Sequence, residues 1–348
     1  MITLGIDAHK RTHTVVAVDE VGRQVATKTT VATSTADHLE LLRWAERFGA
    51  ERSWAVEDCR HLSRRLEADL LAAGERIVRV PPKLMAHARD AARSYGKSDP
   101  IDALAVARAA LRHPDLPAAQ LDDRSRELRL LVDHREDLVN ERTRCINRLR
   151  WHLHELDPGW DPTARSLTSY KNIDGVISRL GQMPGMVARI ALEIAVQIRE
   201  LTVKERALER EITQRISTLA PTLLAMVGVG PLTAAKIVAE VADVRRFRSK
   251  DAFARHNGTA PLPVWSGNHQ RHRLSRTGNR QLNAALHRIA ITQARCHPDA
   301  IEYLERRAAM HNTPAEARRA LKRRLSDVVY RALLEDATVE ITCLDQAA

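Results

Sequence analysis

The sequence predicts an α/β domain followed by an all-α part, with room for two or three domains in 348 residues. Three observations predict this class. Strand and helix signals alternate in residues 1–80, and apolar residues in the middle of the chain recur at three-four spacing. The last third combines helical periodicity with a tight glycine turn.

Residues 1–80 predict a sheet that begins with three antiparallel strands. Residues 2–6 form a buried strand that ends in Asp7, and two further strands follow after connections too short for a parallel crossover. The later strands are expected at residues 14–18, 24–31, 54–56 and 76–80, and the helices at residues 35–47 and 62–73. Three antiparallel strands followed by β-α-β units predict a ribonuclease-H-like fold.

The middle of the chain predicts two long helices. Residues 122–156 are charged with apolar residues at helical spacing, and prolines in residues 158–162 end that helix. Residues 187–219 keep the spacing over about four heptads, with Glu205 and Arg215 as exceptions, which predicts a coiled-coil seam. The two helices can pair as a hairpin in one chain or between chains in a dimer. A helical bundle in a monomer is the alternative.

Residues 221–235 predict a helix, a tight glycine turn and a second helix, as in a helix-hairpin-helix element. Gly228 and Gly230 let backbone N–H groups approach a phosphate, and the second helix presents its positive end. A plain corner between two helices is the alternative. After residues 258–261 the sequence predicts a polar basic loop. Helices are then expected at residues 279–294, 298–310 and 314–334.

The charge of the chain favours a polyanionic partner. The formal net charge is +11, and the segment from Arg245 to Arg288 holds ten Lys or Arg against one acidic residue, Asp251. This concentration predicts a basic face or loop that binds nucleic acid, with a merely solvated surface as the alternative. Aromatic residues make up only 3%, which argues against a surface that binds single strands by stacking on rings.

The sequence favours a cytoplasmic protein without a membrane partner. No apolar run approaches the ~20 residues of a membrane span, and residues 1–7 do not look like a signal peptide. The cysteines are far apart and form no CxxC pair, which argues against a zinc ribbon or a disulfide framework. Free thiols are therefore expected at Cys59, Cys145, Cys296 and Cys343.

Four carboxylates follow the order that a two-metal nuclease needs. Asp7 ends the first strand, Glu57 ends a later strand, and Asp99 and Asp102 open the helix that begins near Lys97, with Asp99 as a candidate cap. Two Mg²⁺ ions about 4 Å apart can hold the attacking and leaving oxygens of a phosphodiester, and Mn²⁺ can replace them. Taken one at a time, each acid is equally well a cap or a solvated charge.

A serine lies in the basic loop. Ser266 and Gly267 are followed by Arg271, Arg273 and Arg276. A hydroxyl beside guanidinium groups can serve as a nucleophile at a phosphate, because the cations stabilise the charge of the transition state. A turn residue before Gly267 is the alternative for Ser266, and Ser275 is a rival nucleophile.

Two blocks of motifs resemble one family. The first contains residues 5–10 (GIDAHK), 56–57 (VE) and 97–103 (KSDPIDA). The second contains residues 227–235 (VGVGPLTAA), 246–249 (RFRS), 258–261 (GTAP), 266–267 (SG) and 278–280 (GNR). Over about residues 1–295 the chain resembles the DEDD transposases, the bacterial insertion-sequence recombinases of the "insertion sequence one-ten" family.

The resemblance implies a division of the chain into four regions. These are a RuvC-like metal-dependent domain at residues 1–115, a coiled-coil oligomerisation region at 120–220, a C-terminal transposase domain at 221–296 and a helical tail at 297–348. Asp7, Glu57, Asp99 and Asp102 would be the metal-binding tetrad, and Ser266 would form a transient phosphoserine link to DNA. The residues expected to contact nucleic acid are Lys97, Gly228, Gly230, Arg248, Gly267, Arg271, Arg273, Arg276 and Arg280.

The resemblance also implies partners. Family members excise and insert their element in double-stranded DNA, guided by a structured bridge RNA. Their dimers pair into tetramers in which the RuvC-like domain of one subunit meets the serine domain of another. Two departures stand out. Trp265 replaces a small polar residue and either packs under the loop or stacks on a base, and Thr259 stands where leucine is common.

Two rival functions remain open at this stage. A RuvC-like junction endonuclease would cut DNA and leave ligation to other proteins, so that replacing Ser266 would preserve cleavage. A non-enzymatic nucleic-acid-binding protein would use the helix-hairpin-helix and the basic loop alone, so that replacing Asp7 would change nothing measurable. The sequence does not specify the guide RNA, the target site or the symmetry of the oligomer.

Overall fold

The computed structural model describes residues 1–348 except Val31, Cys59, residues 91–95, Lys97, residues 121–122, 267–268, Leu274, residues 276–277 and Ala348. It describes the backbone but not the side chains of residues 60–61, 123, 266, 269–271 and 339–347. The chain forms two compact units. Unit 1 joins Met1–Asp122 to Ala242–Thr338, and unit 2 contains Asp123–Val241 and Val339–Ala348. The four regions expected from the sequence stay a prediction.

The N-terminal part of unit 1 is a mixed sheet with the strand order β3-β2-β1-β4-β5. The strands are β1 (Ile2–Ala8), β2 (His13–Val18), β3 (Gln24–Thr29), β4 (Arg52–Glu57) and β5 (Ile77–Val80). β2 pairs antiparallel with β1 and β3, whereas β4 runs parallel to β1 and β5 runs parallel to β4. This order and these directions confirm the predicted ribonuclease-H-like fold.

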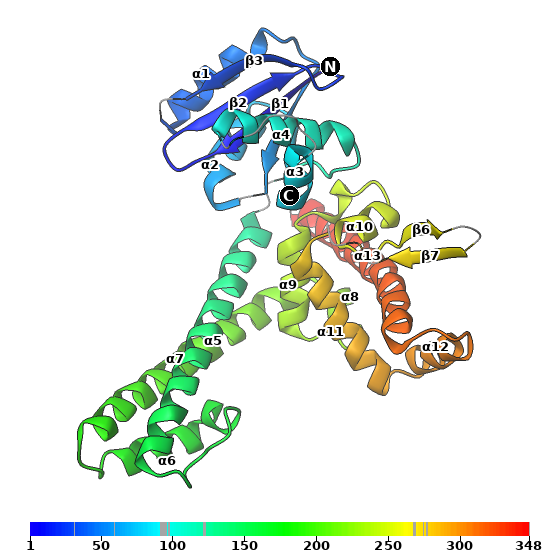
Figure 1. The fold of residues 1–348 in the computed structure, drawn as a ribbon. Coiled ribbons are helices and arrows are strands. Elements are labelled where there is room, and N and C mark those ends of the chain that lie inside the picture. The colour runs from blue at the N-terminus through cyan, green and yellow to red at the C-terminus, as the bar shows by residue number, and fades with distance from the viewer. Residues whose placement is uncertain are drawn as a thin grey trace. The chain divides into compact units, whose positions relative to one another are not determined.

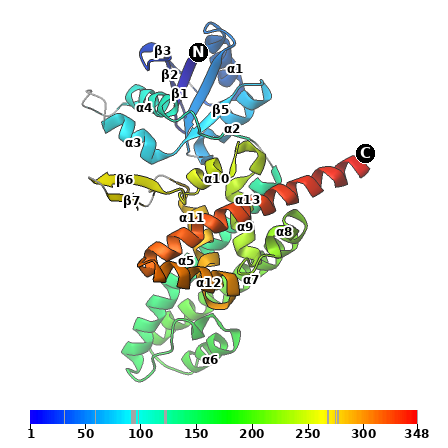
Figure 2. The same ribbon diagram turned by 90° about the vertical axis from the view of Figure 1, so that its right-hand side faces the viewer.

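Helices cover both faces of this sheet (Figure 2). They are α1 (Thr35–Glu46), α2 (Arg60–Ala72), α3 (Pro82–Asp90) and α4 (Asp99–Arg112). Leu4 and Ile6 of β1 point into a core with α1 and α2. Because side chains alternate along a strand, Gly5 and Asp7 face the other side, where α4 lies. The fold therefore turns Asp7 toward α4.

Unit 2 is helical. Its elements are α5 (Asp123–Leu156), the short helix η1 (Ser166–Thr168), α6 (Tyr170–Leu180), α7 (Met186–Leu219), α8 (Pro221–Leu224) and α9 (Pro231–Val241). Helices α5 and α7 have 34 residues each, which gives them a length of roughly 50 Å. They lie side by side (Figure 1), and their contacts run antiparallel, with Arg135 on Glu209 and Cys145 on Gln197. The predicted intrachain hairpin is thus present.

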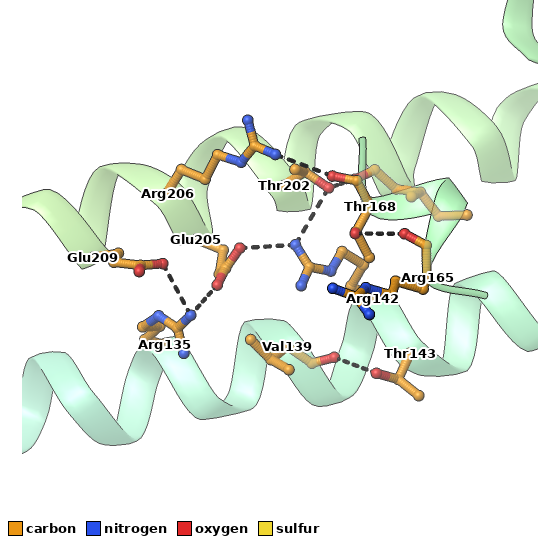
Figure 3. A network of polar contacts seen from close by, with 11 residues as sticks. Arg135, Val139, Arg142, Thr143, Arg165, Thr168, Thr202, Glu205, Arg206 and Glu209 are labelled. Atoms are coloured by element: carbon orange, nitrogen blue, oxygen red, sulfur yellow. Dashed lines mark hydrogen bonds and ion pairs between the residues drawn. The ribbon is translucent and has the colours of Figure 1, made fainter. Parts of the chain in front are cut away.

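Glu205, an exception in the predicted seam, is the centre of a polar network between α5 and α7 (Figure 3). Its side chain is only 5% exposed. Arg142 donates to Glu205 Oε2 at 2.8 Å, and Arg135 donates to Oε1. Leu149 and Ile198 belong to the apolar core around this pairing. A buried carboxylate needs such partners, so the two arginines of α5 offset the cost of burying Glu205 of α7.

The C-terminal part of unit 1 contains helices around a short hairpin. Its elements are the short helix η2 (Val244–Arg246), α10 (Lys250–His256), β6 (Leu262–Ser266), β7 (His269–Arg273), α11 (Arg280–Cys296), α12 (Pro298–Ala309) and α13 (Pro314–Ala347). Tyr330 of α13 donates to the carbonyl of Phe247 at 3.2 Å, and its ring packs on Phe253. These contacts attach α13 to η2 and α10.

The predicted basic loop is partly wrong, because the structure forms the antiparallel hairpin β6–β7 there. The strands have no recognisable pattern in the sequence, because β6 contains Pro263 and β7 consists of polar residues. A two-stranded ribbon tolerates proline at its edge, and it has no buried face that would produce an apolar alternation. Among the described residues, no helix has the length and apolar character that crossing a membrane requires.

Candidate active site

Asp7 and Glu57 lie on neighbouring parallel strands. The register of β1 and β4 pairs Ile6 with Val56, so the next residues along the two strands are Asp7 and Glu57. Parallel neighbours in register point to the same face, which here is the face covered by α4. The Asp7 carboxylate is nearly buried and Glu57 is half-buried. The predicted placement of both acids at strand ends is confirmed.

Gly5 sets the distance between β1 and α4. A Cβ on Gly5 would lie 2.2 Å from the carbonyl oxygen of Ala103 and 2.7 Å from the Cβ of Ala107. Only a glycine permits the helix to approach the strand this closely. Asp102 precedes Ala103 in the first turn of α4, and Asp99 is the first residue of the helix. The close approach therefore brings both acids to the end of β1 that carries Asp7.

The acids repel one another. Burial raises the pKa of Asp7, and the charges of Asp102 and Asp99 raise it further, against a lowering effect of His9. Burial likewise raises the pKa of Glu57, with additional contributions from Asp7 and Asp102 and an opposing one from Arg89. Each of the four predicted acids thus acts electrostatically on another member of the set, so the structure brings them together in one cluster.

Two basic side chains outside the predicted set of site residues lie beside this cluster. His9 Nε2 donates to Asp7 Oδ2 at 3.0 Å and lies 3.7 Å from Asp99 Oδ1. The hydrogen bond to Asp7 raises the pKa of His9. Arg89, from α3, donates to Asp102 Oδ1 at 3.1 Å. His9 follows Asp7 by two residues within the quoted GIDAHK motif, which is the one signal that pointed to it.

The donor set suits a divalent cation. One ligand atom each from Asp7, His9 and Asp99 lies within 4.8 Å of the others. Carboxylate oxygens are hard ligands, and a bound cation would relieve the repulsion that raises the pKa values of Asp7 and Glu57. Among the described residues this donor set is Asp7, His9 and Asp99, and the role of all four acids as metal ligands stays a prediction. Ser98, rather than Asp99, is the N-cap of α4.

Ser266 is the last residue of β6 and pairs with His269 of β7. Its side chain is not described, and neither is that of Arg271. Lys97, Gly267 and Arg276 lie outside the described residues. Trp265 is 69% exposed, so its side chain does not pack under the hairpin. The role of Ser266 as a nucleophile stays a prediction.

The remaining residues expected to contact nucleic acid fall into two groups. Arg273 on β7 and Arg280 at the start of α11 are exposed. Arg248 forms an ion pair with Asp115, although its side chain is still largely exposed. Gly228 adopts a positive φ of 85° in the turn before α9, and the carbonyl of Gly230 accepts the first hydrogen bonds of that helix. The predicted tight turn is present, and its binding role is untested.

Two family models match the chain in the order of the two motif blocks. A transposase model of the DEDD type covers residues 4–158, and the model described as "Transposase IS116/IS110/IS902 family" covers residues 220–305. The insertion element IS116 protein of Streptomyces clavuligerus is 30% identical over 96% of this chain and 95% of its own length. The chain belongs to the IS116/IS110/IS902 family of transposases.

Other relatives of the transposase are insertion-element proteins too. The IS900 protein of Mycobacterium paratuberculosis is 28% identical over 96% of both chains. Among solved structures, RuvC of T. thermophilus in complex with a Holliday junction substrate matches 33% of the transposase and 94% of RuvC at 19% identity, with a TM-score of 0.27.

Family membership confirms the coarse functional predictions. The transposase is a DNA-processing enzyme, and DNA is its partner. The DEDD type of its N-terminal domain implies use of divalent metal, in agreement with the acid cluster around Asp7. The prediction of a non-enzymatic binding protein is therefore excluded.

Proposed function

We propose that the transposase cuts and rejoins the DNA strands of an insertion element, with Asp7, Glu57, Asp99 and Asp102 as metal ligands and Ser266 as the nucleophile. The convergence of the four acids at the end of β1, made possible by Gly5, is the observation that carries this proposal. Two Mg²⁺ ions, when bound, would polarise the scissile phosphodiester and offset its negative charge.

The residues of the chain have separate tasks in this scheme. Asp7 and Glu57 present oxygens from rigid strands, so their positions do not depend on loop motion. His9 and Arg89 hold Asp7 and Asp102 in one orientation through the hydrogen bonds described above. They also reduce the repulsion among the acids before a cation arrives. His9 and Arg89 are therefore positioning residues.

The covalent step exchanges one phosphate ester for another. A bond forms between Ser266 Oγ and phosphorus, the bond from phosphorus to a deoxyribose oxygen breaks, and that oxygen gains the proton that the serine loses. Attack by a deoxyribose hydroxyl of the new partner strand reverses the exchange and restores Ser266. Ester energy is conserved, so rejoining needs no nucleotide cofactor. Exposed Arg273 on the same hairpin supplies positive charge for the phosphate.

The proposal includes an RNA guide and an oligomer. The concentration of positive charge between Arg245 and Arg288 supports a second polyanion beside the DNA. The turn at Gly228 and the N-terminus of α9 offer backbone N–H groups for one of these phosphates. A composite site, with acids from one subunit and the serine from another, is the arrangement that we propose for the active oligomer.

The test is incubation of the full-length transposase with DNA of the element ends, Mg²⁺ and co-expressed RNA, followed by denaturing electrophoresis. We expect a covalent protein–DNA band that Ser266→Ala abolishes and that EDTA prevents. Ser275→Ala is the matched control and should retain the band. A free nick without a covalent band, unchanged in Ser266→Ala, would instead establish the alternative of a junction endonuclease without ligation.

A further inference from the structure

A large cavity lies in the C-terminal part of unit 1. Its lining residues come from Gly258 to Arg324, far along the chain from the residues of the acid cluster. Its walls are the loop of residues 258–261, the β6–β7 hairpin and the corner between α12 and α13. Its volume is about 1350 Å³. Sites for small molecules usually measure about 300 to 1,000 Å³, so this space suits a segment of a polymer better. We call it the α12–α13 cavity.

The lining of the α12–α13 cavity is strongly basic. Among the described lining residues, a single carboxylate, Glu316, faces six cations. These cations are Arg273, Arg307, Arg319, Lys322, Arg323 and Arg324. Five of them belong to α12 and α13, beyond residue 305 where the family model ends. None of these five residues belongs to the two motif blocks or to the predicted site residues.

Several of these cations are oriented by neutral partners instead of by acids. Lys322 is only 8% exposed, and its ammonium donates to Asn283 Oδ1 at 2.6 Å. Burial lowers the pKa of Lys322, and the charge of Arg319 lowers it further. The guanidinium of Arg324 lies 4.4 Å from the ring centroid of Tyr303. These contacts position the positive charges without neutralising them.

Arg307 presents a similar situation. Its Nε is buried and has no hydrogen-bond partner among the described residues. Arg323, in contrast, is paired with Asp251 at 2.5 Å and with Asp327. A buried cation without a counter-ion is costly, because desolvation is not compensated by an opposite charge. Lys322 is buried and Arg307 is half-buried, and among the described residues no carboxylate forms an ion pair with either of them.

We propose that the α12–α13 cavity binds the sugar-phosphate backbone of a nucleic acid, with Lys322 and Arg307 as inner phosphate ligands and Arg324 at the rim. Several cations spread over a polymer-sized space match a row of phosphates better than one free anion. The proposal rests on the proposed function only in taking nucleic acid as the partner. It adds a binding surface outside the acid cluster.

The test measures binding by the full-length transposase in EDTA, so that cleavage does not contribute. Fluorescein-labelled duplex DNA of random sequence and a labelled RNA hairpin are titrated in separate arms at several salt concentrations. We expect Arg307→Gln and Arg324→Gln each to weaken binding about tenfold and to reduce the slope of log affinity against log salt by about one. Arg331→Gln, an exposed arginine of α13 outside the cavity, is the control with matched charge and should bind as the unaltered protein does.

The arms identify the source of the phosphates. A loss confined to DNA or to RNA names that polymer, and a loss in both arms shows a shared backbone site. Unchanged binding in both arms, or an equal loss in Arg331→Gln, would overturn the proposal. Arg324 is exposed, so its variant keeps the test valid if Arg307→Gln impairs folding. The two proposals can fail separately. If Arg307→Gln and Arg324→Gln weaken binding but the unaltered protein forms no covalent band with DNA, the cavity proposal stands and the proposed function is refuted.

Discussion

At the scale of single residues, the acid cluster depends on which carboxylates face α4. Glu57 is the last residue of β4, and the charges of Asp7 and Asp102 act on its carboxylate, whereas Asp58 lies just beyond the strand. We expect Glu57→Gln to reduce DNA cleavage at least about a hundredfold, because a neutral amide is a poor ligand for a divalent cation. Asp58→Asn is the adjacent control and should stay within a few-fold. Equal losses in the two variants would contradict the assignment.

His13 gives a second prediction at this scale. It is buried opposite the ring of His38, whose Nδ1 is hydrogen-bonded to Asp69. Burial, followed by the charges of His38 and His9, lowers the pKa of His13 from 6.5 to about 4. The unfolded chain therefore binds a proton between these two pH values that the folded chain does not. The free energy of unfolding should fall as the pH drops from about 6.5 to about 4.

This loss should be about 3 kcal/mol. It is measured by urea denaturation over that pH range, in parallel for the unaltered protein and His13→Leu. The variant should lose the corresponding part of the pH dependence. The same slope in both proteins would show that other groups are responsible.

The sequence predicted that the four acids converge, because Asp7 and Glu57 lie at strand ends and Asp99 and Asp102 open a helix. It did not predict the partners of those acids. The contact of Arg89 with Asp102 depends on how α3 packs, and neither α3 nor its packing has a clear signature in the sequence. His9 lies beyond the end of β1, where the turn rather than periodicity decides its direction.

At the scale of elements, Gly5 determines how closely α4 packs against β1. We expect Gly5→Ala to displace α4 and to destabilise the protein by about 1 to 3 kcal/mol, because the new methyl overlaps Ala103 and Ala107. Divalent metal affinity should fall about tenfold or more, since Asp99 and Asp102 move with the helix. Thermal unfolding and calorimetric titration with Mn²⁺ measure the two effects.

Gly175 provides the matched control for this change. It lies in α6, and an added Cβ meets nothing within 4 Å. Gly175→Ala should therefore stabilise the protein slightly through helix propensity and leave metal affinity unchanged. A metal affinity that survives Gly5→Ala intact would show that the close approach of α4 does not position the acids.

The pairing of α5 with α7 gives the next prediction. Glu205→Gln leaves Arg135 and Arg142 close together without their buried carboxylate, so we expect a loss of about 3 to 5 kcal/mol in unfolding free energy. Glu211→Gln breaks an exposed pair with Arg215 and should leave the urea midpoint nearly unchanged. Similar midpoints for both variants would mean that the network does not stabilise the pairing of α5 with α7.

Periodicity predicted the elements that bury one continuous face. The strands of the N-terminal sheet and the helices α5 and α7 have a strong apolar repeat, and the structure forms them within a few residues of the expected bounds. The hairpin β6–β7 and the helices α3, α6 and α10 were not predicted. The hairpin lacks a buried face, and α6 follows directly after the proline-containing break of residues 158–162.

At the scale of the whole molecule, the arrangement of the active oligomer decides which residues work together. If acids from one subunit act with the serine of another, Asp7→Asn and Ser266→Ala subunits should complement each other. Random mixing makes roughly half of all dimers mixed, each with one intact site, so roughly a quarter of the original activity should return. The covalent-band assay after joint refolding measures it. Recovery near zero would place both functions in one subunit.

The fold of unit 1 determines which part of the chain can fold first during synthesis. The apolar cores of the sheet take all their described members from residues at or before Ala119. The ribosome still has to add 144 residues after Asp122 to reach Ser266, which takes roughly 7 to 29 s. A nascent chain can thus fold the sheet that carries Asp7 and Glu57 well before its own serine has been translated. Under the proposed mechanism, such an unfinished chain can attack DNA only with the help of a completed copy.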